Sequence, residues 1–327
     1  MTILVSIFSG FRMWTIPGAH VEALRREFPA DTILHAVDDE QTRELIEEAE
    51  IAFAAFITPD QLRAAPRLQW VHCPAAGVGH MLYPEMVESG VTITNGRGTS
   101  ADTIAEHVLA VVLALFRRLP VAHTRQTQHA WAQDEIASPP GNRTIAGSQV
   151  LMVGLGRIGV ATATRLTALG ATVRGIRRRR DAAPVPGVES VHPPEALHQL
   201  LPDADVVVLA APQTMTTKGL IGEAELARMK RDAVLVNVSR GSLIDEDALV
   251  QALRSGALAG AALDVFRHEP LGSDDPVWDV PNLLITPHVS GFRRDHWDAA
   301  VALFVENRRR FGAGEPLLNV VDKKAGY

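Results

Sequence analysis

The chain has 327 residues, of which 46% are hydrophobic and 21% are charged, and its formal net charge is -6. This composition is typical of a globular protein long enough to form two domains, and it lacks the basic excess expected of a nucleic-acid-binding protein. A single cysteine, Cys73, excludes a framework of intrachain disulfides.

The cysteine count and the apolar segments also indicate the cellular compartment in which the protein resides. One cysteine fits a reducing environment, and we expect Cys73 to be a small buried residue rather than a nucleophile. Residues 1–8 lack the basic leader and cleavage site of a signal peptide, and the apolar run at 108–116 is too short to cross a bilayer. We therefore expect a cytoplasmic protein without a membrane partner.

The first hundred residues alternate between apolar runs and helical patterns. Strands are predicted at residues 3–8, 32–37, 51–56, 68–72 and 91–94. Helices are predicted at residues 20–28, 40–49 and 59–65. This alternation predicts an α/β domain with a parallel sheet and no phosphate-binding loop of its own. Met13 and Trp14, in the loop after the first strand, are candidates to line a substrate site.

A long apolar helix follows. Residues 101–119 are apolar on most faces, so the helix should be buried, and we expect it to run between two domains. Ser100 or Thr99 is the expected N-cap. Residues 120–140 are polar and are expected to be irregular.

The most informative stretch is Val150-Leu-Met-Val-Gly154-Leu-Gly156-Arg-Ile-Gly159. It predicts a strand that enters a glycine turn and delivers a phosphate to the N-terminus of a helix. Gly154 would permit the turn, Gly156 would let a pyrophosphate approach, and Gly159 would let the helix pack on the strand. The alternative is a purely structural turn. A second strand predicted at residues 171–176 favours a dinucleotide site.

The remaining elements complete a second α/β domain. Further strands are predicted at residues 206–210, 234–238, 260–264 and 283–286, and a last helix at 297–311 should return to the first domain. We thus predict two Rossmann-like or flavodoxin-like α/β domains with parallel sheets, the first one discontinuous. The substrate domain would comprise residues 1–98 and 292–327, and the dinucleotide-binding domain residues 99–291.

Three polar residues follow strands of the second sheet. Arg240, Glu269 and His288 come after the strands at 234–238, 260–264 and 283–286. Ligands of parallel sheets bind at the carboxyl ends of the strands, so these side chains should meet at one edge. There a guanidinium can hold the carboxylate of a 2-keto acid, and a histidine can donate a proton to its carbonyl. A carboxylate beside the histidine would favour the protonated ring.

Each of these residues also has a simpler interpretation. Arg240 would then bind only a phosphate, Glu269 would be a surface carboxylate, and His288 would be a hydrogen-bonded core residue. Their coincidence at three strand ends favours the catalytic interpretation.

Several blocks of the chain resemble the D-isomer-specific 2-hydroxyacid dehydrogenase family. They are Val236-Asn-Val-Ser-Arg240-Gly-Ser-Leu-Ile-Asp245, Ala262-Leu-Asp264-Val-Phe-Arg-His-Glu269-Pro-Leu and Thr286-Pro-His288-Val-Ser-Gly. In the first half, Ala75-Ala-Gly77-Val78-Gly-His resembles the family's loop for the substrate carboxylate, and Ala105-Glu106-His107 falls in its linking helix.

The resemblance implies roles for individual residues. Arg240 would bind the keto acid, His288 would be the acid–base residue and Glu269 its partner. Backbone N–H groups at Ala76, Gly77 and Val78 would hold the substrate carboxylate. Asp264 would hold the nicotinamide amide, and Pro212 and Thr217 would line the adenosine side. The predicted cofactor-binding residues are Gly154, Leu155, Gly156, Arg157, Ile158, Gly159, Arg177, Arg178, Ala211, Pro212, Thr217, Val238, Ser239, Asp264 and Gly291. No metal site is predicted.

Two positions depart from the family pattern. Gly79 stands where the family's loop usually has aspartate, which bears on the rigidity of the loop. Where an NAD-preferring enzyme has Asp or Glu, about twenty residues past the glycines, this chain has Arg177, followed by further arginines at 178–180. Arginines attract the 2′-phosphate of NADP(H), so we predict NADP(H) preference, with NAD(H) use possible. The alternative is a solvated basic loop.

The substrate and the assembly follow from the resemblance alone. The arginine-bearing loop is similar to that of glyoxylate/hydroxypyruvate reductases, so we expect reduction of such a small 2-keto acid to the D-2-hydroxy acid. The alternatives are a dehydrogenase for a bulkier 2-keto acid and a catalytically weak, cofactor-sensing scaffold. The family implies a homodimer. Trp131 would then either reach a neighbour's active site or pack at the dimer interface.

Overall fold

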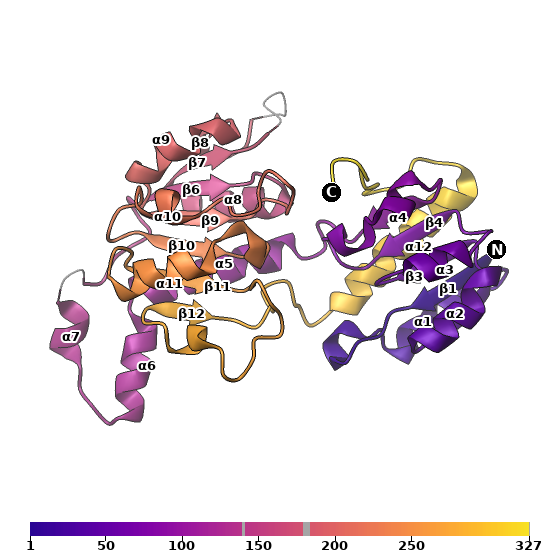
Figure 1. Cartoon of the computed structure of the whole chain (residues 1–327), viewed down its shortest axis with the longest axis horizontal. Helices are drawn as coiled ribbons and strands as arrows, with labels where there is room; N and C mark the ends of the chain where they lie inside the picture. The colour runs from indigo at the N-terminus through magenta and orange to yellow at the C-terminus, as the bar shows by residue number, and fades with distance from the viewer. Residues whose placement is uncertain (139–140, 179–183, 327) are drawn as a thin grey trace. The chain divides into compact units, whose positions relative to one another are not determined.

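The computed structural model describes residues 1–138, 141–178 and 184–326. It divides the chain into two compact units, Met1–Thr99 with Arg293–Tyr327, and Ser100–Phe292 (Figure 1). Each unit is built on a sheet of parallel strands, so the predicted α/β class with two parallel sheets is confirmed.

The first unit contains a sheet of five described strands in the order β2-β1-β3-β4-β5. The strands are β1 (Thr2–Ser6), β2 (Thr32–Ala36), β3 (Ile51–Ala54), β4 (Trp70–Cys73) and β5 (Thr92–Asn95). Its helices are α1 (Gly18–Glu27), α2 (Asp39–Leu45), α3 (Pro59–Arg63), α4 (Pro84–Glu88) and α12 (His296–Ala313). Every residue of β3 and β4 is buried, as expected for central strands of a parallel sheet covered on both faces.

The last helix, α12, belongs to the first unit. The Phe304 ring stacks on Phe53 with 4.4 Å between centroids and on Trp70 with 5.4 Å. After the helix, Val321 N–H donates to the carbonyl of Ile93 at 2.9 Å. The prediction that this helix returns to the first domain is therefore confirmed.

The second unit contains a sheet of seven described strands in the order β12-β11-β10-β9-β6-β7-β8. The strands are β6 (Gln149–Val153), β7 (Thr172–Ile176), β8 (Val188–His192), β9 (Val206–Leu209), β10 (Val234–Asn237), β11 (Gly260–Leu263) and β12 (Leu283–Ile285). The strand order reverses between β6 and β9, which creates a topological switch point at the end of β6.

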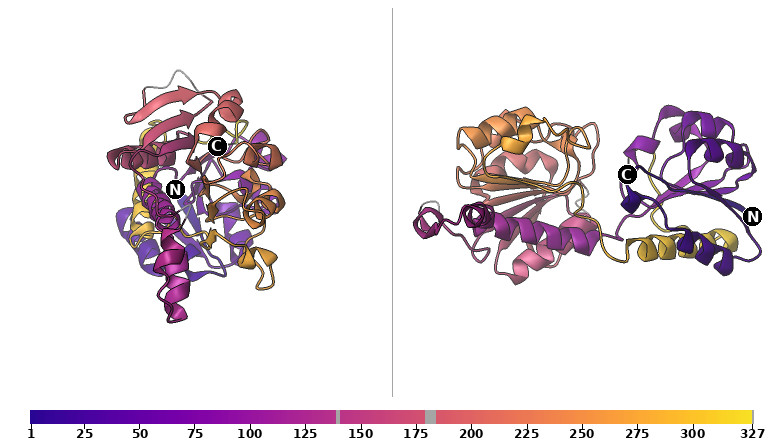
Figure 2. Two further views of the ribbon diagram at one scale, coloured as in Figure 1. Left: turned by 90° about the vertical axis from the view of Figure 1, so that its left-hand side faces the viewer. Right: turned by 90° about the horizontal axis from the view of Figure 1, so that it is seen from below.

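Helices cover both faces of this sheet (Figure 2). Its helices are α5 (Ala101–Phe116), α6 (Leu119–Thr127), α7 (Gln133–Ala137), α8 (Arg157–Ala168), α9 (Leu197–Leu200), α10 (Glu223–Leu226) and α11 (Glu246–Arg254). One hydrophobic cluster joins α5 and α8 to one face, and another joins α9, α10 and α11 to the opposite face. The apolar α5 is thus buried within the second unit, where Val108, Val112 and Phe116 lie in the core.

Two local predictions around α5 were wrong, and the predicted cap was in place. The helix ends at Phe116 rather than at 119, because Arg118 adopts a left-handed conformation with φ 52° and a new helix, α6, begins at Leu119. Ser100 is the N-cap residue, one of the two that the sequence predicted, although its side chain makes no capping bond. The Thr99 hydroxyl donates instead to the carbonyl of Gly96 at 2.8 Å. Residues 120–140 also contain two helices, α6 and α7, instead of an irregular segment.

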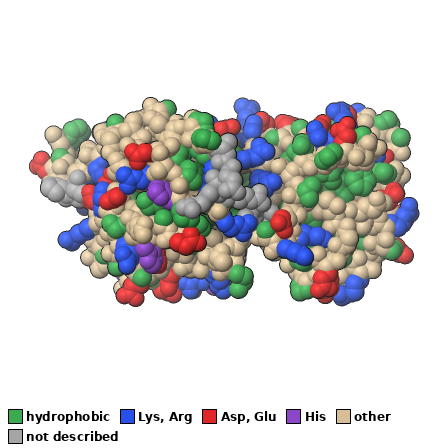
Figure 3. All heavy atoms as spheres, turned by 90° about the horizontal axis from the view of Figure 1, so that it is seen from above, with side chains coloured by type: hydrophobic (Ala, Val, Ile, Leu, Met, Phe, Trp, Pro, Cys, Tyr) green, Lys and Arg blue, Asp and Glu red, His purple; other side chains and the backbone are tan. Residues whose placement is uncertain are grey.

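One face of the molecule is mixed in charge. On the face drawn in Figure 3, basic and acidic side chains of the described residues are interspersed, as is typical of a solvated surface. Within the described ranges, none of the helices has the length and apolarity needed to span a membrane.

Candidate active site

The glycine turn joins β6 to α8. Gly154 has a φ of 101°, a conformation that side chains with a Cβ rarely adopt. A Cβ on Gly159 would lie 2.0 Å from the carbonyl oxygen of Gly154, so only glycine lets the first turn of α8 pack against the turn. The sequence therefore sets both the path of the turn and the position of the helix start.

The N-terminus of α8 has the character of an anion site. The helix begins at Arg157, after Gly156, and a Cβ on Gly156 would meet no protein atom within 4 Å. The first N–H groups of a helix have no intrahelical acceptor, and the dipole adds positive potential there. Leu155 is buried below the turn, whereas Arg157 is exposed and Ile158 half-buried. These residues fit a nucleotide phosphate at the switch point of the sheet.

Arginines follow β7, the neighbour of β6. Arg177 is half-buried, and its backbone N–H donates to the carbonyl of His192 in β8 at 3.0 Å. Arg178 is exposed. Both residues are thus at the carboxyl end of the strand next to the glycine turn. Arg179 and Arg180 lie outside the described residues.

Two loops follow β9 and β10. The first is closed by Thr217, whose hydroxyl donates to the carbonyl of Pro212 at 2.7 Å. The second begins with the buried residues Val238 and Ser239, and the Ser239 hydroxyl donates to the carbonyl of the buried Ala211. The predicted cofactor residues of these loops therefore form one connected rim at the carboxyl ends of adjacent strands.

Arg240 emerges from the turn after β10. Asn237 is fully buried and closes this turn, because its amide donates to the carbonyl of Arg240 at 2.9 Å while its oxygen accepts from the N–H of Ser239 at 3.0 Å. The Arg240 guanidinium donates to the carbonyl of Ser239 at 2.6 Å. Burial lowers the pKa of Arg240, and the negative charge of Glu269 opposes this shift.

The loops after β10 and β11 approach very closely. A Cβ on Gly241 would lie 2.0 Å from the backbone carbon of Phe266, so any other residue at 241 must push the loops apart. Phe266 N–H donates to one carboxylate oxygen of Glu269 at 2.8 Å. This approach brings Arg240 and Glu269 near enough for their charges to affect each other's pKa.

Glu269 and His288 form a hydrogen-bonded pair. Nδ1 of His288 lies 2.5 Å from Oε2 of Glu269. Burial raises the pKa of Glu269, but the hydrogen bonds from His288 and from the Phe266 N–H, with the charges of His288 and Arg240, lower it on balance. The carboxylate is thus ionised at neutral pH and accepts the proton of Nδ1. Such a pair can orient an imidazole for proton transfer through Nε2.

Asp264 anchors the loop that carries His288. Its side chain is 1% exposed, and its carboxylate accepts from the N–H groups of Val289 at 2.9 Å and Ser290 at 3.0 Å. The backbone of His288 is left-handed, with φ 52°, and its N–H donates to the Asp264 carbonyl at 2.9 Å. Gly291 follows this loop, beside Ser100 at the start of α5.

The sequence reasoning missed three residues of this region. Asn237 shapes the arginine turn, and Thr286 and His107 contact each other and Asp264 beneath the His288 loop. Thr286 and His107 fall within the quoted sequence blocks, where each is a polar residue among apolar neighbours, but nothing in the sequence shows that they meet. Their connection depends on how α5 packs on the sheet.

The predicted substrate loop lies in the first unit, after β4. The side-chain amide of Asn95 donates to the carbonyl of Ala76 at 2.7 Å, and Val78 is buried. Gly79 begins a short 3-10 helix, and a Cβ there would meet no atom within 4 Å. Cys73 is buried as expected, and burial raises the pKa of its thiol to about 12. Met13 and Trp14 lie in a 3-10 helix of the same unit.

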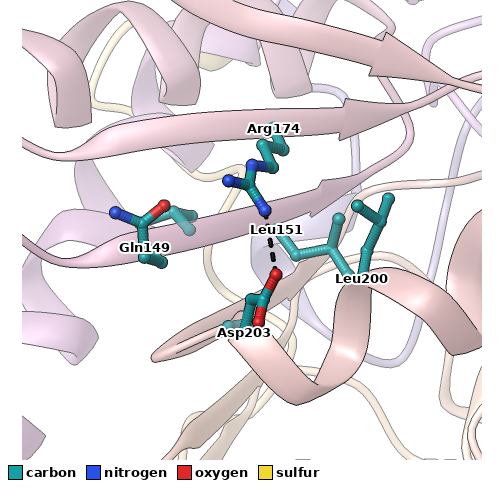
Figure 4. A pocket seen from close by; sticks show the side chains of 7 residues that line it. Gln149, Leu151, Arg174, Leu200 and Asp203 are labelled. Atoms are coloured by element: carbon teal, nitrogen blue, oxygen red, sulfur yellow. Dashed lines mark hydrogen bonds and ion pairs between the residues drawn. The ribbon is translucent and has the colours of Figure 1, made fainter.

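A shallow hollow occurs elsewhere in the second unit (Figure 4). Its lining includes Gln149 at the start of β6, and Arg174 of β7, whose guanidinium lies 3.1 Å from Asp203. Because ligands of parallel sheets bind at the carboxyl ends, this hollow is not part of the candidate site.

Comparisons with known proteins identify the family of the chain. Residues 109–290 match the family model described as D-isomer specific 2-hydroxyacid dehydrogenase, NAD binding domain. A glyoxylate reductase of Korarchaeum cryptofilum is 34% identical to the chain over 273 residues, which cover 82% of this chain and 80% of that protein.

Two solved structures are similar along nearly their whole length. One is a D-isomer specific 2-hydroxyacid dehydrogenase from Xanthobacter autotrophicus in complex with NADPH and MES, with a TM-score of 0.83 and 32% identity over 99% of both chains. The other is an NADPH-dependent glyoxylate/hydroxypyruvate reductase from Sinorhizobium meliloti in complex with NADP and sulfate. Its TM-score is 0.84, with 27% identity over 100% of this chain and 99% of that chain. The chain therefore belongs to the D-isomer specific 2-hydroxyacid dehydrogenase family of NAD(P)-dependent oxidoreductases.

Proposed function

We propose that this protein is an NADP(H)-preferring reductase that converts a small 2-keto acid, of the glyoxylate or hydroxypyruvate type, to the D-2-hydroxy acid. The observation that carries the proposal is the His288–Glu269 pair beside Arg240, at the sheet edge where the glycine turn also lies. The names of the relatives, glyoxylate reductase and NADPH-dependent glyoxylate/hydroxypyruvate reductase, support the same substrate class.

We assign the proton transfer to His288. Because Glu269 accepts the Nδ1 proton, Nε2 is the atom that gives a proton to the carbonyl oxygen of the keto acid as the alcohol forms. The ionised Glu269 stabilises the imidazolium before the transfer and fixes the plane of the ring. In the oxidative direction the neutral ring accepts the proton.

We assign substrate binding to Arg240 and to the loop of Ala76, Gly77 and Val78. The guanidinium is half-buried and charged, so it can hold the keto acid and polarise its carbonyl with little competition from water. The backbone N–H groups of the loop would hold the substrate carboxylate.

We assign cofactor binding to the rim of the second unit. NADPH, when bound, supplies the hydride. The start of α8 would hold the pyrophosphate, and Arg177 and Arg178 would bind the 2′-phosphate with charge-assisted hydrogen bonds. Asp264 would accept from the nicotinamide amide through a carboxylate oxygen that also binds the loop of His288.

We further propose a homodimer that uses α6 and α7. Neither helix buries a residue against the described part of its own chain, and both extend away from the sheet (Figure 1). Leu119 is 54% exposed and Trp131 is 91% exposed, which is unusual for large apolar side chains unless they meet a partner. Sedimentation of the full chain tests this assembly, and a monomer would contradict it.

One experiment tests the activity. NADPH oxidation is followed with glyoxylate, hydroxypyruvate and a series of bulkier aliphatic and aromatic 2-keto acids, and the series is repeated with NADH. The proposal requires the highest kcat/KM with a small acid and NADPH. Turnover confined to bulky acids would make the protein a different dehydrogenase, and no turnover with any acid would favour a cofactor-sensing scaffold.

A further inference from the structure

A chain of three polar side chains links α5 to the loop that carries His288. Nε2 of His107, in α5, lies 3.2 Å from Oγ1 of Thr286. The same hydroxyl oxygen lies 2.6 Å from Oδ1 of Asp264. All three residues belong to the second unit. The side chain of His107 is 18% exposed and that of Asp264 only 1%, and Thr286 is half-buried.

The direction of the hydrogen bonds follows from the donors available. An ionised carboxylate only accepts, so the hydroxyl of Thr286 must donate its one proton to Asp264. The hydroxyl oxygen can then only accept from His107, which requires that Nε2 of His107 carries a proton. Burial lowers the pKa of His107, against the opposing charge of Asp264, and so favours the neutral ring. The contact with Thr286 then places the single ring proton on Nε2.

Asp264 connects the Thr286 hydroxyl to the loop of His288 through hydrogen bonds. Its Oδ1 accepts from the Thr286 hydroxyl and from the Val289 N–H, while Oδ2 accepts from the Ser290 N–H. Both oxygens bind the loop only while the carboxylate keeps one orientation. His288, adjacent to Val289, has the left-handed backbone that a non-glycine residue keeps only when its surroundings hold it. The orientation of Asp264 thus determines the position of the His288 backbone.

We propose that His107 is a positioning residue for His288, acting through Thr286 and Asp264. The inference rests on the proposed role of His288 in proton transfer. Without the donor on His107, the Thr286 hydroxyl loses the hydrogen bond that fixes its orientation. The Asp264 carboxylate is then held less firmly, and its hydrogen bonds to the loop of His288 weaken. The imidazole of His288 is then less well placed to transfer a proton to the substrate. We therefore expect kcat to fall more than the affinity for the substrate.

The test uses the full chain with His107→Leu and His107→Gln. Leucine removes the donor, whereas the glutamine amide can still donate to Thr286. We expect His107→Leu to lower kcat about five- to tenfold, the effect of one lost hydrogen bond. KM for glyoxylate should stay unchanged, any loss of NADPH affinity through Asp264 should be smaller than the loss of kcat, and the solvent deuterium isotope effect on kcat should rise. His107→Gln should restore most of kcat. His198→Leu, which removes a histidine hydrogen bond to Glu225 away from the site, in α9, is the matched control.

A second pair of variants gives the same test if His107→Leu does not fold. Thr286→Val removes the hydroxyl, and Thr286→Ser keeps it, so only the valine variant should lose kcat. If both single variants fold, His107→Leu and Thr286→Val together should cost little more than either alone, because they break one chain of bonds.

Three results from the single variants would overturn the inference. They are a wild-type kcat in His107→Leu, a loss confined to the affinity for NADPH, and a His107→Gln variant as slow as His107→Leu. Fully additive losses in the double variant would also overturn it. A His288→Ala variant that keeps its rate would instead refute the proposed function, so the two failures are distinguishable.

Discussion

Nδ1 of His288 lies 2.5 Å from Oε2 of Glu269, and the second oxygen of Glu269 accepts the N–H of Phe266 at 2.8 Å. Both oxygens of the carboxylate are thus used, one to fix the imidazole and the other to fix the glutamate itself. This pair links the loops after β11 and β12.

Glu269→Gln should slow keto-acid reduction. The neutral amide holds the imidazole without the charge-assisted bond of the carboxylate, so kcat/KM for the keto acid should fall about tenfold or more at pH 7. Rates across the pH range measure this, with Glu306→Gln as the control at an exposed ion pair. A Glu269→Gln enzyme with the wild-type kcat/KM would exclude the proposed role of Glu269.

The lowered pKa of Glu269 also predicts how far the pH can fall before the Glu269–His288 pair is lost in the wild-type protein. A carboxylate whose folded pKa lies below its ordinary value of 4.5 stabilises the fold above that pH, and its contribution is lost as the pH falls through the folded pKa. The pair should therefore stay intact at pH 5. In the pH profiles just described, a loss of activity from protonation of Glu269 should appear only below pH 4.5.

Arg240→Lys should lower kcat/KM for the keto acid about 100-fold, because an ammonium cannot reproduce the planar donors of a guanidinium. The affinity for NADPH, measured by fluorescence titration, should stay near the wild-type value. Arg267→Lys is the matched control on the neighbouring loop, where the arginine makes exposed ion pairs. Equal kinetics of Arg240→Lys and wild type would mean that Arg240 does not bind the substrate.

Arg177→Asp should shift the cofactor preference. The carboxylate repels a 2′-phosphate and accepts from ribose hydroxyls, so the ratio of kcat/KM with NADPH to that with NADH should fall about 100-fold. Arg228→Asp makes the same charge change at an exposed site after α10 and should leave the ratio unaltered. A wild-type enzyme that prefers NADH would contradict the assignment before any variant is made.

Gly241→Ala should impair catalysis without touching a reacting group. The added Cβ would overlap the backbone of Phe266, so the loops that carry Arg240 and Glu269 must separate. We expect a destabilisation of about 1–3 kcal/mol together with a lower kcat/KM, measured by thermal unfolding and initial rates. Gly18→Ala, where a Cβ meets no atom within 4 Å, should behave like the wild type. If both variants were fully active, the loop approach would be irrelevant to the site.

The sequence predicts the sheets well because buried parallel strands appear as apolar runs. β8 was missed since Val188–His192 is half-exposed and has no such run. The end of α5 was placed too late because the left-handed Arg118 breaks a helical pattern that continues in the sequence. These errors come from local backbone geometry, which residue types only partly specify.

The site could be predicted only in part. Parallel topology alone indicates that Arg240, Glu269 and His288 follow strands at one edge, and the family resemblance adds that Glu269 is the partner of His288. The approach of Gly241 to Phe266 and the bonds of Asp264 depend on the path of each loop. They become visible only in three dimensions.

The most direct test of the account is the turnover and NADPH affinity of His288→Ala. If His288 is the proton donor, kcat for keto-acid reduction should fall about 100- to 10,000-fold, while the Kd for NADPH changes little because the substitution removes only the proton transfer. A His288→Ala enzyme that reduces glyoxylate or hydroxypyruvate at near the wild-type rate would contradict the central claim.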